Sequence, residues 1–243
     1  MRLLANAKLT WTLEVTGRRP DGLHELRSEM CSLDLADTLL VDESGDYLEV
    51  EGAGEDVSTG DDNLVRRALE LVNRRAGVRL SKVIPSGGGL GGGSADAAAI
   101  LRWAGCHDLD TALRLGSDVP FCLAGGRALV EGVGERVSPL EDVERTVTLL
   151  LPSWRIGTAD VYRAFDEGHR SLGSVNDLEV AACAVEPRLG ELLGWARSRY
   201  DDVRLAGSGS TVFIVGDVRA DEDVPDFVGS LRWMVSRTTP RTG

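Results

Sequence analysis

Long hydrophobic runs are missing from this sequence: none approaches the roughly 20 apolar residues that a membrane-spanning helix needs. The first residues also lack the hydrophobic segment of a signal peptide. Cysteine is sparse, and no C-x-x-C pair occurs among Cys31, Cys106, Cys122 and Cys183. We therefore expect a cytoplasmic protein with no membrane partner, whose cysteines are reduced core residues.

Basic charge is also scarce, with 27 Lys and Arg against 39 Asp and Glu and a net charge of −12. A nucleic-acid surface needs basic side chains to neutralise phosphates, so no nucleic-acid partner is expected. Lysine occurs only twice among the 27 basic residues, as Lys8 and Lys82. An ammonium is not interchangeable with a guanidinium beside a phosphate or carboxylate, which makes both lysines candidate site residues. Chance survival of two lysines is the alternative.

Glycine is abundant, with 29 residues in the chain and six of them among the seven positions 87–93. The β-branched residues 83–84 before this run predict the end of a strand. The alanine-rich segment 95–104 after it predicts a helix capped by Ser94 or Asp96. Glycine amides can approach a ligand closely, and a helix N-terminus adds positive potential. The sequence therefore predicts a phosphate-binding loop rather than a mobile linker.

Two common phosphate loops fit this segment poorly. No Lys follows the last glycine, which excludes the G-x-x-x-x-G-K-[ST] loop. A G-x-G-x-x-G match can be drawn, and Asp108 or Asp110 then lies near the distance of a ribose-binding acid, but no strand is expected before either. A dinucleotide-dependent oxidoreductase is the corresponding alternative, and an NADH titration would test it.

The mixture of predicted elements indicates an α+β protein. Strands are expected over residues 2–15, 26–34, 38–43, 47–51, 79–84, 127–131, 136–137, 146–151, 203–206, 211–215 and 231–237. Helices are expected over residues 64–76, 95–104, 108–115, 158–168, 177–184 and 187–200. A compositional boundary predicts an N-terminal domain, 1–143, and a C-terminal domain, 144–243, with a frayed tail after residue 237.

Four motifs in the chain occur in a fixed order. They are Ala7–Leu9 with Thr16–Leu26, then Lys82–Ala98, then Leu115–Phe121 with Glu131–Glu135, and finally Leu205–Phe213. Together they resemble the motifs of 4-diphosphocytidyl-2-C-methyl-D-erythritol kinases, a family of the GHMP kinase superfamily. The glycine loop alone would specify only the superfamily. The stretches P-D-G-x-H-E-L and G-S-D-V-P-F narrow the resemblance to this family, and segments 157–162 and 176–179 also fit it.

This resemblance implies a GHMP kinase fold. Such a fold combines an N-terminal α/β domain, of the ribosomal protein S5 domain 2-like type, with a ferredoxin-like C-terminal domain. ATP and a small-molecule substrate would lie in the cleft between them. The implied reaction transfers the γ-phosphoryl group of ATP, with Mg²⁺, to the 2-hydroxyl of 4-diphosphocytidyl-2-C-methyl-D-erythritol, a step of the non-mevalonate route to isoprenoid precursors.

Two catalytic residues are implied by the resemblance, Lys8 and Asp118. The carboxylate would orient the acceptor hydroxyl and take its proton as transfer proceeds. The ammonium would keep that carboxylate ionised and stabilise charge on the migrating phosphoryl group. The alternatives are a solvent-facing strand lysine and a turn or N-cap aspartate.

The resemblance also implies the binding residues. Those expected to bind ATP are Asn63, Lys82, Pro85, Gly87, Gly88, Gly89, Leu90, Gly91, Gly92, Gly93 and Ser94. Those expected to bind the substrate are His24, Thr158, Tyr162, Gly207 and Ser208, with His24 and Tyr162 at the cytosine ring. The alternatives are a helix N-cap for Asn63, an exposed loop position for His24, a core position for Tyr162 and a plain hairpin turn at 207–209. No structural metal is expected, because His107 and His169 lack companions at ligand spacing.

Two positions depart from the family pattern. Leu23 stands where these kinases usually carry Tyr, and Thr10 replaces a common Asn. Loss of one aromatic face, worth on the order of 1 kcal/mol or more, would weaken substrate binding about tenfold. A GHMP-type kinase with a different small-molecule acceptor is therefore the alternative. A nucleotide-binding protein without catalysis is a further one, against which the presence of Lys8, Asp118 and the complete loop argues. An ADP-release assay over a panel of acceptors would separate them.

Overall fold

The computed structural model describes residues 1–52, 57–170, 173–218 and 230–241. Its strands are β1 (Arg2–Thr10), β2 (Glu14–Arg18), β3 (His24–Asp42), β4 (Leu48–Gly52), β5 (Gly77–Lys82), β6 (Arg127–Gly132), β7 (Arg136–Pro139), β8 (Thr146–Pro152), β9 (Val203–Leu205), β10 (Val212–Val215) and β11 (Leu231–Thr239). Its helices are α1 (Leu64–Leu71), α2 (Gly92–Trp103), α3 (Leu109–Leu113), α4 (Val119–Ala124), α5 (Thr158–Asp166), α6 (Glu179–Val185) and α7 (Pro187–Arg197).

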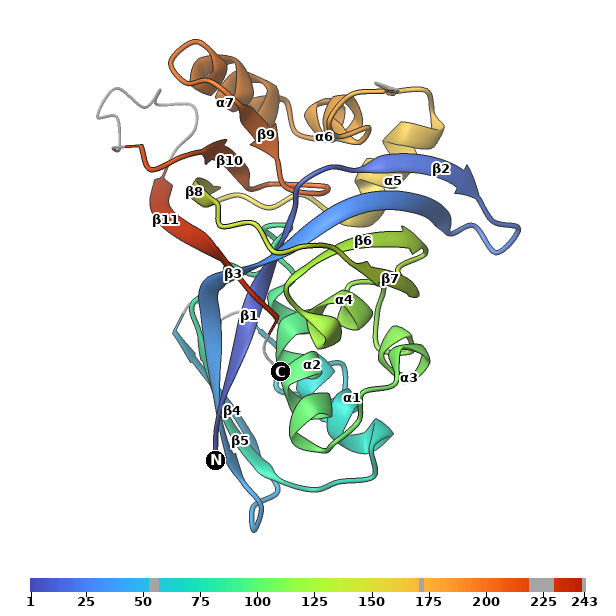
Figure 1. Ribbon diagram of the computed structural model, residues 1–243, viewed down its shortest axis with the longest axis vertical. Coiled ribbons are helices and arrows are strands. Elements are labelled where there is room, and N and C mark those ends of the chain that lie inside the picture. Colours follow the sequence, from blue (N-terminus) through green and yellow to red (C-terminus); the bar gives the residue numbers. More distant parts are fainter. Residues whose placement is uncertain (53–56, 171–172, 219–229, 242–243) are drawn as a thin grey trace.

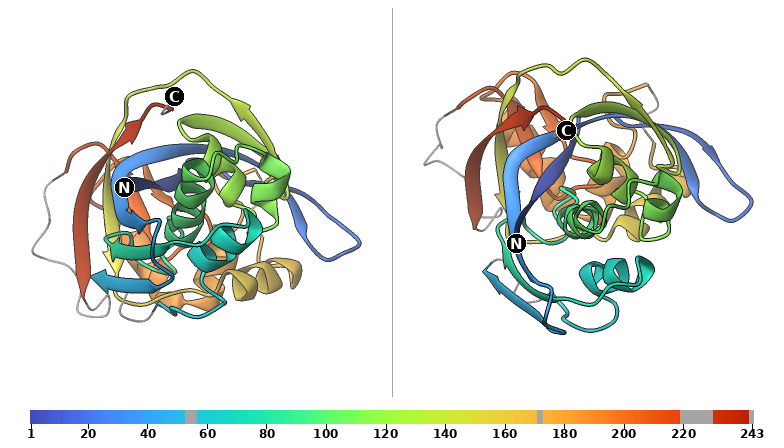
Figure 2. Two further views of the ribbon diagram at one scale, coloured as in Figure 1. Left: turned by 90° about the horizontal axis from the view of Figure 1, so that it is seen from below. Right: turned by 60° about the horizontal axis from the view of Figure 1, so that its bottom comes forward.

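The longest strand, β3, organises the N-terminal part. It pairs with β1, β2, β5, β6 and β11, all antiparallel. Two separate strands, 26–34 and 38–43, were expected because Asp is disfavoured inside strands. That prediction was wrong, because Asp37 is fully buried within β3 and its carboxylate is paired there. The β2–β3 hairpin projects from the body of the molecule (Figure 1, Figure 2).

Helices α1 to α4 gather on one side of β1, β3 and β5, and α2 packs against β1, α1 and α4 (Figure 1, Figure 2). The core between these layers includes Leu39, Leu80, Ile100 and Phe121, all fully buried or nearly so. The alanines of α2 are buried on several sides, and their small side chains allow this close packing. The packing fixes the start of α2, and with it the end of the glycine loop.

The C-terminal part joins a small antiparallel sheet to helices α5, α6 and α7. In this sheet β8 pairs with β10 and β11, and β10 also pairs with β9. Buried residues from both the sheet and the helices form its core, among them Leu150, Phe165 and Leu192. In Figure 1 these helices lie beside β8, β9 and β10 at the opposite end of the molecule from β4 and β5.

Strand β11 connects the two parts. Its residues 231–237 pair with β8, and Thr238 and Thr239 pair with β3. The resulting sheet runs in the order β4-β5-β3-β11-β8-β10-β9. The expected fraying after residue 237 is therefore wrong for these two threonines. The predicted domain division at 143 and 144 falls between β7 and β8 and stays a prediction.

Three helix predictions need correction. The helix expected over residues 64–76 ends at Leu71. Helix α2 begins at Gly92 instead of residue 95, and its N-cap is Gly91 in a left-handed conformation rather than Ser94 or Asp96. The low helix propensity of glycine favours a helix start after the glycine run, but the left-handed turn at Gly91 directs the chain into the helix earlier. Helix α4 was not expected at all. It has six residues, with Pro120 in its first turn, and is too short for a periodic pattern.

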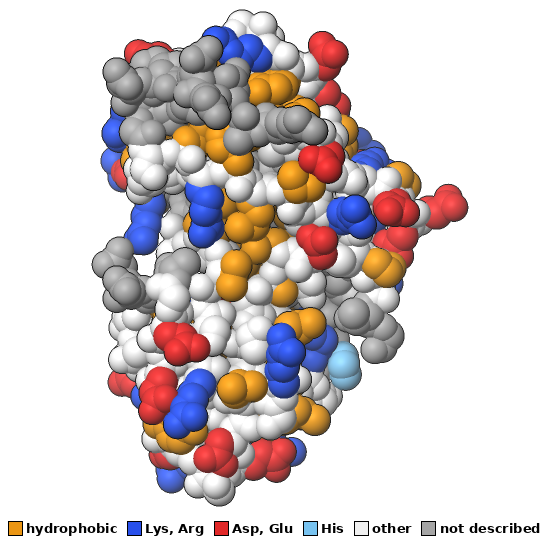
Figure 3. Space-filling model, turned by 90° about the vertical axis from the view of Figure 1, so that its left-hand side faces the viewer, with side chains coloured by type: hydrophobic (Ala, Val, Ile, Leu, Met, Phe, Trp, Pro, Cys, Tyr) orange, Lys and Arg blue, Asp and Glu red, His pale blue; other side chains and the backbone are white. Residues whose placement is uncertain are grey.

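On the face shown in Figure 3, acidic and basic side chains are interspersed with hydrophobic ones. The net negative charge is thus not gathered into one patch on that face. Among the residues that the structure describes, no helix is both long and apolar enough to cross a membrane.

Candidate active site

A cavity of about 960 Å³ lies where β1, the glycine loop, α2, α4, α5 and the 205–213 motif meet. Most of the predicted site residues line it: Lys8, His24, Asn63, Lys82, Pro85, Gly87, Gly89, Gly91, Gly92, Gly93, Ser94, Asp118, Thr158, Tyr162, Gly207 and Ser208. Gly88 and Leu90 do not line it. The fold therefore brings segments from both ends of the chain to one cavity.

Lys8 and Asp118 meet in the wall of this cavity. The Nζ atom of Lys8 lies 3.3 Å from Oδ2 of Asp118 and donates a hydrogen bond of 3.1 Å to Oγ1 of Thr10. The Lys8 side chain is 7% exposed and that of Asp118 is 33% exposed. Asp118 occupies the N-cap position of α4, but its side chain makes no capping bond there. Its carboxylate is therefore available to the lysine and to a ligand.

The loop between β6 and β7 packs against the backbone of Ser117, the residue before Asp118. A Cβ atom on Gly134 would lie 2.1 Å from the carbonyl oxygen of Ser117, so only glycine permits this approach. The loop is held in turn by Glu135, whose carboxylate accepts a 2.7 Å hydrogen bond from the amide of Val133. The E-G-V-G-E motif thus sets the backbone next to the candidate catalytic carboxylate.

The glycine loop is fixed on two sides. The amide of Lys8 donates a 3.0 Å hydrogen bond to the carbonyl of Leu90, whose side chain is fully buried. The carbonyl of Gly88 accepts a 3.2 Å hydrogen bond from the amide of Thr211. Gly88 and Leu90 therefore anchor the loop from outside the cavity. Gly91 has φ of +68°, and a Cβ atom there would lie 2.7 Å from Cγ of Lys8.

The second glycine turn closes the cavity from the C-terminal part. Asn176 holds this turn by donating hydrogen bonds of 3.0 and 2.7 Å to the carbonyls of Leu205 and Gly207. The hydroxyls of Thr158 and Ser208 lie 2.9 Å apart. Sequence reasoning noted the segment around Asn176 but gave this residue no role, because its partners are distant in the chain.

Lys82 lies beneath the glycine loop in a buried charge cluster. Its Nζ atom donates to carboxylate oxygens of both Asp37 and Asp96, the latter at 2.7 Å. Burial lowers the pKa of Lys82, but the charges of Asp96 and Asp37 outweigh this effect and leave the pKa raised. Asn63 serves as the N-cap of α1, where its Oδ1 accepts a 2.8 Å hydrogen bond from Val65. Contacts of Lys82 and Asn63 with a nucleotide stay predictions.

His24 and Tyr162 both line the cavity and stack against each other. Their ring centroids are 4.7 Å apart with an interplanar angle of 21°. The Nε2 atom of His24 lies 2.8 Å from Oδ1 of Asp166, which also pairs with Arg18 at 3.4 Å. Burial raises the pKa of the Tyr162 hydroxyl, so it stays neutral. Leu23, beside them, is half-exposed.

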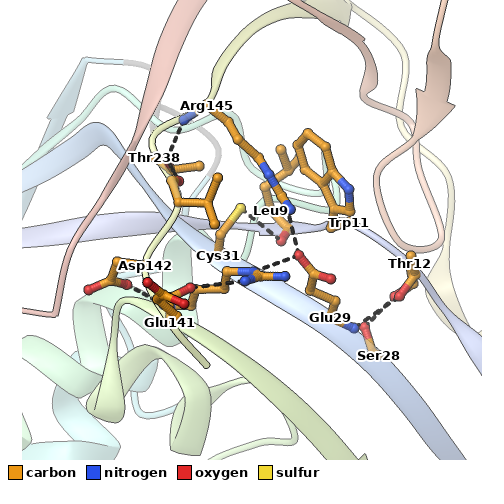
Figure 4. A network of polar contacts seen from close by, with 12 residues as sticks. Leu9, Trp11, Thr12, Ser28, Glu29, Cys31, Glu141, Asp142, Arg145 and Thr238 are labelled. Carbon is orange, nitrogen blue, oxygen red and sulfur yellow. Dashed lines mark hydrogen bonds and ion pairs between the residues drawn. The ribbon is translucent and has the colours of Figure 1, made fainter. Parts of the chain in front are cut away.

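A polar network behind the site fixes the end of β1 (Figure 4). The guanidinium groups of Arg145 and Arg204 lie over the Trp11 ring, 4.0 and 4.8 Å from its centroid. Arg145 also donates to the carboxylate of Glu29, as does Arg127, at 2.7 and 2.8 Å. Burial raises the pKa of Glu29, but the hydrogen bonds and the charges of Arg127 and Arg145 together outweigh it and hold the pKa below its ordinary value. Trp11 does not line the cavity and is no substitute for the missing aromatic residue.

Residues 63–126, which hold the glycine loop and Asp118, match the family model "GHMP kinases N terminal domain". The chain is 42% identical over 219 residues to the 4-diphosphocytidyl-2-C-methyl-D-erythritol kinase of Pelotomaculum thermopropionicum, covering 76% of this chain and 75% of that protein. It is 37% identical over 238 residues to the enzyme of the same name from Paracoccus denitrificans, covering 87% and 85%.

Solved structures share the fold of this chain. A crystal structure of a 4-(cytidine 5'-diphospho)-2C-methyl-D-erythritol kinase matches with a TM-score of 0.76 and 32% identity over all of both chains. A homoserine kinase from Cytophaga hutchinsonii matches with a TM-score of 0.63 at 16% identity, over 99% of this chain and 95% of that one, and this shows the shared fold alone. The predicted α+β GHMP kinase fold is thereby confirmed. The chain belongs to the family of 4-diphosphocytidyl-2-C-methyl-D-erythritol kinases.

Proposed function

We propose that this protein transfers the γ-phosphoryl group of ATP to the 2-hydroxyl of 4-diphosphocytidyl-2-C-methyl-D-erythritol. One observation carries the proposal: the ion pair of Lys8 and Asp118 lies in a cavity next to the glycine loop. A carboxylate that can take the proton of a hydroxyl, beside an ammonium that can stabilise phosphoryl charge, suits phosphoryl transfer to a hydroxyl. Membership of the family supports ATP as the phosphate donor.

Asp118 would act on the acceptor hydroxyl. Its carboxylate is one-third exposed towards the cavity, so a hydroxyl can reach it without displacing Lys8. It would orient the hydroxyl and accept its proton as the new P–O bond forms. Lys8 would favour the ionised carboxylate and stabilise the charge on the transferring phosphoryl oxygens.

The glycine loop would hold the ATP phosphates. Gly87, Gly89 and residues 91–93 line the cavity, and α2 begins directly at the loop. Twelve helical residues point their N-terminal dipole at this place, which favours the polyphosphate. Most of the catalysis expected here is positioning and charge stabilisation, as in other phosphoryl transfers.

Mg²⁺ would arrive with ATP. The described residues contain no group of three or more His, Cys, Asp or Glu side chains that could hold a metal ion by themselves. Mg²⁺ that is bound with ATP takes most of its ligands from phosphate oxygens and water, so it does not need such a group. Ser94, at the start of α2 and facing the cavity, is the hydroxyl we assign to it. When bound, the ion would neutralise charge on the phosphates.

The cytidine end of the substrate would lie at His24 and Tyr162. These rings line the end of the cavity that is formed by α5 and the β2–β3 hairpin. Both carry hydrogen-bonding or stacking groups that suit a pyrimidine base.

We also propose a cytoplasmic location without a nucleic-acid or membrane partner. The free cysteines Cys31, Cys106, Cys122 and Cys183 support the location.

A coupled ADP-release assay tests the proposed function. The purified chain is given ATP and Mg²⁺ with 4-diphosphocytidyl-2-C-methyl-D-erythritol, homoserine, mevalonate or galactose in turn. We expect the highest kcat/KM with the first acceptor and a new phosphomonoester at its 2-position, assigned by ³¹P and ¹³C NMR. Better turnover of another acceptor would instead make the protein a GHMP-type kinase with a different substrate. ATP binding without any turnover would contradict the enzyme assignment.

A further inference from the structure

The Lys8 ammonium has two side-chain partners among the described residues, Asp118 and Thr10. Its bond to Oγ1 of Thr10, 3.1 Å long, is buried. A lysine has a flexible four-carbon stem, so a single partner does not fix the position of its Nζ atom. An ammonium carries three N–H donors. With one directed at Asp118 and one at Thr10, the third is left for a ligand.

Thr10 lies on the same side of β1 as Lys8, because alternate residues of a strand point to the same face. Leu9, between them, is fully buried in the core. Both Lys8 and Thr10 line the cavity, although Thr10 is only 2% exposed. The backbone of Thr10 already pairs with Met30 on β3. The hydroxyl is therefore not needed to hold the strand in the sheet.

The end of β1 that carries Thr10 is held by the network shown in Figure 4. The amide of Trp11 donates a 2.7 Å hydrogen bond to the carbonyl of Glu29. The guanidinium groups of Arg145 and Arg204 lie over the Trp11 ring. These contacts fix the residue that follows Thr10, and a threonine side chain is itself stiff at χ1. A rigid hydroxyl is thus set against a flexible ammonium.

The second glycine turn leaves the space beside these two groups open. A Cβ atom on Gly207 would lie 3.4 Å from Oγ1 of Thr10 and 3.6 Å from Nζ of Lys8. Gly207 also lines the cavity, and its carbonyl is held by Asn176. A ligand in the cavity can therefore approach the ammonium through the space that a Cβ atom would fill.

We propose that Thr10 is a positioning residue, whose hydroxyl holds the Lys8 ammonium so that its remaining N–H group faces the transferring phosphoryl group. The inference rests on the proposed function, which places that phosphoryl group beside Lys8. Thr10 then acts on the reaction through Lys8 and not by contact with the acceptor. Without the hydroxyl, the Nζ atom has Asp118 as its one remaining partner and loses its fixed place.

Steady-state kinetics in the ADP-release assay tests the inference. Thr10→Val keeps the shape of the side chain but removes the hydrogen-bond acceptor, so kcat should fall about tenfold or more. The KM values for ATP and the acceptor should stay within about threefold, because no substrate contact is lost. Thr10→Ser keeps the hydroxyl and should retain most of the wild-type kcat.

Thr148→Val is the matched control. Thr148 is a buried threonine on β8 that does not line the cavity. Its hydroxyl bonds the backbone of Gly216 and Val218. Its loss should therefore leave kcat unchanged. Urea unfolding followed by circular dichroism checks that each variant is folded. If Thr10→Val does not fold, the comparison of Thr10→Ala with Thr10→Ser asks the same question.

A double-mutant cycle shows whether Thr10 acts through Lys8. In a Lys8→Met background the hydroxyl has no ammonium to hold, so adding Thr10→Val should change kcat by less than about twofold. A merely structural role of Thr10 would instead lower kcat by the same factor in both backgrounds.

Three results would overturn the inference. They are a kcat of Thr10→Val equal to that of the wild type, a rise in the acceptor KM with kcat unchanged, and equal losses of kcat with and without the Lys8 ammonium. In each case the wild type still transfers the phosphoryl group, and the proposed function stands. A wild type that phosphorylates no acceptor would overturn the proposed function, and the inference with it.

Discussion

The two lysines of this chain occupy two kinds of charged site. Each is buried and each meets a carboxylate, but the surroundings differ. Lys82 is enclosed by Asp37 and Asp96, whose carboxylates are as deeply buried as the ammonium. Lys8 meets one carboxylate, Asp118, which is one-third exposed to the cavity.

This difference separates an ion pair that stabilises the fold from an ion pair that can contact a ligand in the proposed site. An enclosed ammonium between two carboxylates holds β3, β5 and α2 together, and both of its ion pairs are within the fold. An ammonium beside a single, partly exposed carboxylate leaves that carboxylate free to bind another group. Counting lysines in the sequence marks both positions, but only the exposure of the partner distinguishes their roles. Four experiments test this contrast.

Replacing Lys82 should have the largest effect, and it should be on stability. Lys82→Met leaves two buried carboxylates without their cation, which costs about 3–5 kcal/mol in the free energy of unfolding. Urea denaturation followed by circular dichroism measures the loss. Lys8→Met is the matched control and should lose less than about 1 kcal/mol, because Asp118 can be solvated. Equal losses for the two variants would break the contrast.

Replacing Lys8 should affect activity rather than stability. Lys8→Met removes the cation beside Asp118 that we propose stabilises the transferring phosphoryl group, and kcat should fall about 10²–10³-fold, or about 3–4 kcal/mol in the activation barrier. The ADP-release assay measures this at saturating ATP. A kcat within tenfold of the wild type would show that the ammonium takes no part in the reaction.

The contact between Gly91 and Lys8 allows a finer test. In Gly91→Ala the new Cβ would lie 2.7 Å from Cγ of Lys8, at a φ of +68°. Displacement of the lysine should lower kcat about tenfold to a hundredfold. Gly105→Ala is the control, because Gly105 has φ of +75° but no atom within 4 Å of its Cβ position. Both variants share the backbone strain, so only the first should lose activity; equal kcat values would contradict the contact.

The pH dependence of the free energy of unfolding tests the burial of the cluster formed by Asp37, Lys82 and Asp96. The pKa of Asp96 is raised from 3.8 to about 7 by burial and by Asp37. The native state then holds a proton that the unfolded chain has lost, so this contribution is complete below about pH 4 and is lost as pH rises through 7. The slope is at most about 1.4 kcal/mol per pH unit. Urea unfolding from pH 5 to 8.5 should show the slope in the wild type and a flatter profile in Asp96→Asn.

Sequence reasoning identified the glycine loop, the two lysines and Asp118, because each carries a local signal or a family motif. The structure then brought Lys8 and Asp118 to within 3.3 Å. The sequence alone does not identify the role of Asp37. An aspartate inside a strand pattern predicts an interruption of the strand as long as the partner of its carboxylate is unknown. That partner, Lys82, lies 45 positions away. Nor could it place the start of α2, which depends on the left-handed turn at Gly91 and on contact with Lys8.

Strand β11 has a consequence for how the molecule is made. It follows every other strand in the chain, yet it lies between β3 and β8 in the sheet. During synthesis, β8 therefore leaves the ribosome with one edge unpaired, which exposes it to wrong partners until β11 emerges. We expect nascent chains halted before residue 231 to be captured by chaperones, and the two walls of the cavity to come together only after that last strand has been translated.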